Sequence, residues 1–170
     1  MLQKIFVGVI AIALFGCVSK RDIDVDSAKS TKVNLQGYKN YQIVDGSGII
    51  HDSQKIWIPN SNFDVNAEIK QMITTRLGRK GKMPVTQNPD FYVVYATGQD
   101  MNALNIKIDR KGRETIRNIP LAALAIVFVD ATTGELIWVS YSTGQIKSGL
   151  SIKDRKKRLY YTINKMLDGV

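Results

Sequence analysis

The sequence predicts a single α+β domain: a mostly antiparallel sheet of about five or six strands with two helices packed on one face. Three observations predict this fold. Several short segments alternate apolar and polar residues, two longer segments carry apolar residues at helical spacing, and a continuous apolar run of nine residues is followed by a turn and a second apolar segment. We expect the second face of the sheet to be open, curved or covered by a partner.

A leader of the secretory type occupies residues 1–16. Lys4 supplies a positive charge, and the residues from Ile5 to Phe15 form an apolar stretch without a charge. A helix needs about 20 residues to span a bilayer, and this stretch is shorter. We therefore interpret it as a signal peptide that is removed, and not as a membrane anchor.

The end of the leader predicts acylation. Leu14, a variable residue, Gly16 and Cys17 follow one another in an order that resembles the lipobox of bacterial lipoproteins. Cys17 is the only cysteine of the chain, so it has no internal disulfide partner. Two or three acyl chains would hold the protein firmly on a membrane. Residues 17–31 are interpreted as the lipidated cysteine with a flexible tether, and residues 32–170 as the envelope domain.

The first half of the domain combines strands with one helix. Residues 33–43 alternate apolar and polar side chains, and a second extended piece runs over 49–58. Apolar residues at helical spacing predict a helix over 63–79. Residues 91–96 are apolar on both faces and predict a buried strand, and 104–108 predict a one-sided strand. The polar and basic residues 109–120 are interpreted as a mobile loop.

The second half predicts a hairpin and a helix. Residues 121–129 are continuously apolar but too short to span a membrane, so they are interpreted as a buried strand. A turn over 130–134 connects them to the apolar segment 135–146. Ser151 with Asp154 three residues later resembles a capping box, and it predicts a helix over 151–167.

Three segments carry a family resemblance. They are Ile56–Pro59 before the first helix, Pro89–Tyr95 at the buried strand, and Asp130–Trp138 at the hairpin turn. These segments resemble the conserved blocks of the bacterial lipoprotein family catalogued as domain of unknown function 4136. The resemblance covers roughly residues 32–168. It implies a lipoprotein with an α+β domain and without established catalytic residues.

The residue types needed for most polar catalysis are scarce. His51 is the only histidine, whereas a Ser or Cys nucleophile usually needs a histidine base and a zinc site needs three or four ligands. Asp22, Asp24 and Asp26 alternate as in a calcium loop, but Ser27 stands where that loop has glycine. We therefore expect no catalytic residue, no metal and no cofactor.

The charge of the chain is strongly positive. Its 24 basic and 15 acidic residues give +9, and removal of the leader with Lys4 leaves +8. Anionic lipid or envelope polymer would suit this charge, and the envelope location argues against nucleic acid. Two basic segments are candidate contacts to an anionic surface, with a solvated loop and helix face as the alternative. The candidate residues are Lys107, Arg110, Lys111, Arg113, Arg117, Lys153, Arg155, Lys156, Lys157 and Arg158.

These observations predict a membrane-anchored lipoprotein whose periplasmic domain is a non-enzymatic binding or assembly module of the cell envelope. Its partners would be membrane lipid through Cys17, and either an anionic lipid or polymer or an envelope protein complex. By resemblance to Gram-negative lipoproteins, an Asp directly after the cysteine would favour inner-membrane retention. Val18 stands there instead, so we expect the outer membrane, on its periplasmic face, if the organism is Gram-negative. The alternative is a carboxylate-dependent hydrolase of cell-wall or lipid substrates, because the distances between carboxylates cannot be read from the sequence.

Overall fold

The structure is a computed structural model that describes residues 19–44, 47–49, 63–98, 102–108, 114–120, 122–145, 147 and 149–170. The predicted signal peptide, Cys17, His51 and the segment Ile56–Pro59 lie outside the described residues, as does most of the extended piece predicted over 49–58.

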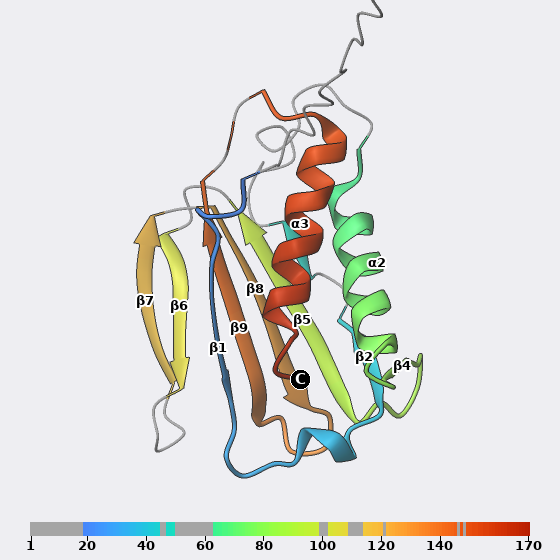
Figure 1. The fold of residues 1–170 in the computed structure, drawn as a ribbon. Helices are drawn as coiled ribbons and strands as arrows, with labels where there is room; N and C mark the ends of the chain where they lie inside the picture. The colour runs from blue at the N-terminus through green and yellow to red at the C-terminus, as the bar shows by residue number, and fades with distance from the viewer. Residues whose placement is uncertain are drawn as a thin grey trace, which may run out of the picture.

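A single sheet forms the centre of the domain (Figure 1). Its strands run in the order β1 (Asp24–Lys29), β9 (Leu136–Gly144), β8 (Ala122–Asp130), β5 (Phe91–Gly98), β2 (Asn40–Ile43) and β4 (Met83–Pro84). The short strand β3 (Gly48–Ile49) also pairs with β5. A separate ribbon is made of β6 (Asn102–Ile108) and β7 (Glu114–Pro120).

The sheet is mostly antiparallel. β1, β9, β8 and β5 pair antiparallel in turn, and the pairing of β8 with β9 confirms the predicted hairpin. β2 pairs parallel with β5, which is possible because helix α2 (Val65–Gly78) lies between them in the chain and returns it to the same end of the sheet.

Both helices cover the same face of the sheet (Figure 1). In α2 the carboxylate of Asp64 accepts the N–H of Ala67 at 3.0 Å, and in α3 (Ile152–Met166) the hydroxyl of Ser151 accepts the N–H of Asp154 at 3.1 Å. Each side chain satisfies a backbone donor that the first helical turn leaves open. The predicted fold class and both predicted helices are confirmed.

The core lies between the helices and the sheet. Helix α2 contributes Ile69, Ile73 and Leu77 to this core. The strands contribute a cluster of aromatic rings, Tyr41, Phe91 and Phe128. On the opposite face of the sheet, strand alternation places side chains that are only half-buried. They include Tyr92, Val94, Val127 and Tyr141.

Three predictions for local structure were wrong. Residues 24–29, predicted as part of the tether, form the edge strand β1, because their backbone pairs with β9. Residues 114–120, predicted as a loop, form β7 opposite β6. Residues 35–37, predicted as part of a strand, form the 3₁₀ turn η1 (Leu35–Gly37), because the side chain of Asn34 accepts the N–H of Gln36 at 3.0 Å.

Candidate functional site

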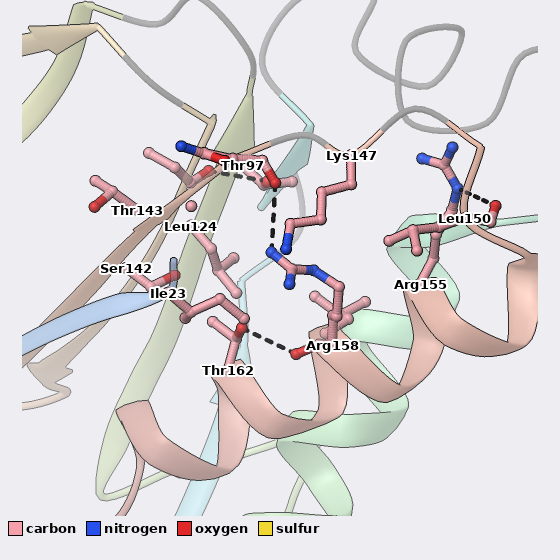
Figure 2. Close-up of a pocket in the computed structure, with 14 residues that line it drawn as sticks. Ile23, Thr97, Leu124, Ser142, Thr143, Lys147, Leu150, Arg155, Arg158 and Thr162 are labelled. Carbon is pink, nitrogen blue, oxygen red and sulfur yellow. Dashed lines mark hydrogen bonds between the residues drawn. The ribbon is translucent and has the colours of Figure 1, made fainter. Parts of the chain in front are cut away.

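A cavity of about 70 Å³ opens at the end of the sheet where β1 begins (Figure 2). The first turns of α3 form one wall, and the ends of β5, β8 and β9 form the other. Its lining is mainly apolar and includes Ile23, Leu124, Leu150 and Leu159. Such a volume holds a few water molecules or a small apolar group.

A buried arginine at the cavity holds the segment that precedes β1. The guanidinium of Arg158 binds both carboxylate oxygens of Asp22, with Nη1–Oδ1 at 3.1 Å and Nη2–Oδ2 at 2.5 Å. It also donates to the carbonyl oxygen of Ser19. The residue is 9 % exposed, so this bidentate pair is largely shielded from water.

A second cation completes this cluster. The ammonium of Lys147 lies 3.1 Å from Oδ1 of Asp22, and the Lys147 and Arg158 side chains converge beside the cavity (Figure 2). The hydrogen bond from Arg158, with a smaller contribution from Lys147, holds the pKa of Asp22 far below its usual value. Asp22 is therefore ionised at neutral pH and fixed in place, and is not suited to donate a proton.

The buried hydroxyls of the cavity are used in local contacts. Thr97 donates to the carbonyl oxygen of Ala123 at 3.0 Å, and Thr162 donates to that of Arg158 at 3.0 Å. Among the described residues, no group of three or more His, Cys, Asp or Glu could hold a metal ion. In the same part of the chain, no helix is long and apolar enough to cross a membrane.

The structure separates the ten predicted basic contacts. Arg110, Lys111 and Arg113 lie outside the described residues, and Lys107 and Arg117 belong to β6 and β7. The other five lie on α3. Of these, Arg158 is buried and so forms no part of an exposed surface.

The remaining four basic residues of α3 differ in their contacts. Lys156 binds Glu68 at 2.6 Å, Lys157 lies 3.6 Å from Asp154, and Nε of Arg155 donates to the carbonyl oxygen of Leu150 at 3.1 Å. Lys153 is exposed. The sequence pattern around Asp22 indicates at most an incomplete calcium loop, and its partner Arg158 has no sequence signal because the two residues are far apart in the chain.

The family assignment rests on nearly the whole domain. A family model described as "Domain of unknown function (DUF4136)" matches residues 24–169. The chain belongs to this family. The match begins at the first residue of β1, in agreement with the finding that β1 is part of the DUF4136 domain. No curated protein shows significant similarity to the chain.

Two solved structures share the DUF4136 fold seen here. A DUF4136 family protein from Bacteroides thetaiotaomicron has a TM-score of 0.63 at 13 % identity, over 87 % of this chain and 95 % of that one. PelC from Paraburkholderia phytofirmans, solved as a dodecamer, has a TM-score of 0.51 at 12 % identity, over 85 % and 94 %. At such identities the likeness shows the fold alone.

Two of the DUF4136-like sequence blocks meet at the end of the sheet opposite the cavity. Asp90 accepts the N–H groups of Lys39 and Asn40, each at 2.7 Å. Asp130 accepts the hydroxyl of Tyr38 and the N–H of Thr133 at 2.7 Å. These hydrogen bonds lower the pKa of both carboxyls, so the aspartates hold loops and turns in position.

Proposed function

We propose that this chain is an acylated envelope lipoprotein whose DUF4136 domain acts as a binding or assembly module and not as an enzyme. The observation that carries the proposal is that the charged side chains beside the cavity bind one another and are not left available for catalysis. Arg158 and Lys147 bind Asp22, only five residues after Cys17 in the sequence. This charged cluster therefore fixes the start of the domain, close in sequence to its proposed lipid anchor.

The carboxylates of the described domain support a role without catalysis. An acid–base pair of the glycosidase type needs one carboxyl whose pKa is raised, so that it can protonate a leaving group. The three carboxyls with clearly shifted pKa values, Asp22, Asp90 and Asp130, are all shifted downward by hydrogen bonds that favour the ionised form. This pattern is typical of structural carboxylates and does not favour the hydrolase alternative.

An assembly role is supported by the exposed face of the sheet and by the structural similarity to PelC. The sheet face without helices carries half-buried apolar side chains such as Val94 and Val127. PelC, which shares the fold, was solved as a dodecamer. In our proposal a partner protein, or further copies of this chain, cover surface that a monomer leaves exposed.

Acylation and location are tested by Cys17→Ser. The wild-type protein should fractionate with membranes, in the outer membrane if the cell is Gram-negative, and its intact mass should exceed that of the processed polypeptide by the attached acyl groups. The variant should lose both properties. A variant that stays on the membrane with an unchanged mass would exclude the proposed anchor.

The absence of catalysis is tested separately. Crosslinking in cells followed by mass spectrometry should recover a reproducible envelope partner, with crosslinks between copies of the chain indicating self-assembly. Purified protein should leave peptidoglycan and phospholipid intact. Turnover that a single Asp or Glu substitution abolishes, without unfolding the domain, would establish the hydrolase instead.

A further inference from the structure

The proposed lipid anchor lies close to a fixed point of the domain. The carbonyl oxygen of Ser19 accepts a hydrogen bond from the buried guanidinium of Arg158. Cys17 precedes Ser19 by two residues, and consecutive Cα atoms are about 3.8 Å apart, so the Cα atoms of Cys17 and Ser19 are separated by less than about 8 Å. An acylated Cys17 would therefore keep this end of the domain at the membrane surface.

Exposed side chains at this end suit a bilayer surface. Ile152, the first residue of α3, is 44 % exposed, which is high for a large apolar side chain. Lys153 beside it and Arg21 near Ser19 are exposed cations, and within the described residues neither side chain forms an ion pair. We call Arg21, Ile152 and Lys153 the rim.

The start of α3 lies at a height that the anchor can reach. Ile152 begins α3 six residues before Arg158, which is a rise of about 9 Å along the helix. Figure 1 shows the first turn of α3 at the end of the sheet where β1 begins. The reach of Cys17 from Ser19 is similar to this rise, so the anchor and the rim can meet one membrane surface together.

We infer that the domain rests directly on the anionic surface of the bilayer that holds its anchor, with Ile152 in the headgroup region and Arg21 and Lys153 against lipid phosphates. This inference depends on the proposed acylation of Cys17. An exposed apolar side chain together with exposed cations matches a charged interface, because the apolar side chain leaves water while the cations stay near anionic headgroups. The short connection to Cys17 favours lipid over a soluble polymer as the occupant.

A fluorescent probe tests whether the start of α3 contacts the bilayer surface. Cys17 is the only native cysteine and its thiol is consumed by acylation, so Ile152→Cys in the lipidated protein provides one reactive thiol. Gln36→Cys is the matched control, because Gln36 is exposed in η1 at the opposite end of the sheet. The labelled protein is placed in vesicles of phosphatidylcholine and phosphatidylglycerol that contain lipids with a nitroxide on the headgroup. The nitroxide should quench the fluorescence of the probe at position 152 at least threefold more strongly than that of the probe at position 36.

Equal quenching at both positions would overturn the inference while leaving the anchor intact. Failure of the protein to stay on the vesicles would instead refute the proposed acylation, so the two failures are distinguishable.

The charge contribution is tested in the same assay. Arg21→Gln with Lys153→Gln should lower quenching of the probe at position 152 at least twofold on anionic vesicles, and have no effect on pure phosphatidylcholine. Lys32→Gln with Lys39→Gln removes the same charge from exposed residues at the other end and should change nothing. An equal loss in both double variants would show a general charge effect and would overturn the rim as the contact.

Discussion

Asp22 and Arg158 lie 136 residues apart in the chain and form a bidentate ion pair beside the cavity. The pair joins the segment before the edge strand β1 to the second turn of α3, so the two ends of the domain sequence are held together at one end of the sheet. The sequence predicts a flexible tether over residues 17–31. The ion pair instead fixes the chain to the domain at Asp22.

Asp22→Asn should destabilise the domain by about 2 kcal/mol at pH 7, because it removes a charge-assisted hydrogen bond and leaves the buried Arg158 without its counter-ion. The pKa of Asp22 is lowered in the folded state, so its stabilisation is fully present above the unfolded value near 4. It is lost as the pH falls through the folded value. The difference between wild type and variant should therefore shrink in acid, as measured by urea denaturation from pH 7 to pH 2.

Asp24→Asn is the control for this experiment, since Asp24 is exposed at the start of β1. It should change the free energy of unfolding by less than about 0.5 kcal/mol. An effect as large as that of Asp22→Asn, or an Asp22 effect that is constant with pH, would count against the ion pair as the cause.

Gly169→Ala should destabilise the domain by about 1 to 3 kcal/mol through overpacking. A Cβ atom at position 169 would lie 2.6 Å from Cη2 of Trp138, and Trp138 is only 3 % exposed, so its ring has little room to move. Gly37→Ala is the control, since nothing lies within 4 Å of its added carbon. Equal denaturation midpoints for the two variants would show that the C-terminal segment does not pack on Trp138.

Tyr38 should titrate well above a free tyrosine. Its hydrogen bond to Asp130 and its burial raise the pKa of Tyr38 to about 12, so the stabilisation is complete below pH 10 and is lost between pH 10 and pH 12. Tyr38→Phe should cost about 1 kcal/mol at pH 7. NMR titration of tyrosine ring carbons, with this variant for assignment, measures the value, and titration of Tyr38 near pH 10 would be inconsistent with the hydrogen bond.

Local signals predicted much of the fold. Ser151 and Asp154 marked the start of α3, and the apolar spacing marked α2, because capping and amphipathic periodicity depend on residues within a few turns. The hairpin of β8 and β9 was also predicted, since its two apolar strands are joined by a short turn.

The error at β1 arose because long-range pairing decides the structure there. β1 contains Asp24, Asp26 and Lys29 and only one half-buried valine, so its composition resembles a linker, yet its backbone pairs with β9 over six residues. β7 was missed although it pairs with β6, its neighbour in the chain, because Glu114, Arg117 and Asn118 are polar like the loop residues before it. At the candidate site the basic charge of α3 was predicted, but the burial of Arg158 was not, since its partner is distant in sequence.

The most direct test of the anchored, membrane-seated domain is neutron reflectometry of the lipidated protein on a supported bilayer. The wild-type protein should show protein density that begins at the headgroups, without a water layer between them. A flexible insertion of 20 Gly and Ser residues between Val18 and Ser19 leaves the contacts of Arg158 with Ser19 and Asp22 intact but lengthens the chain to the anchor, so it should open a hydrated gap. A gap of the same width in both proteins would contradict the claim that Arg158 and Asp22 hold the domain at its anchor.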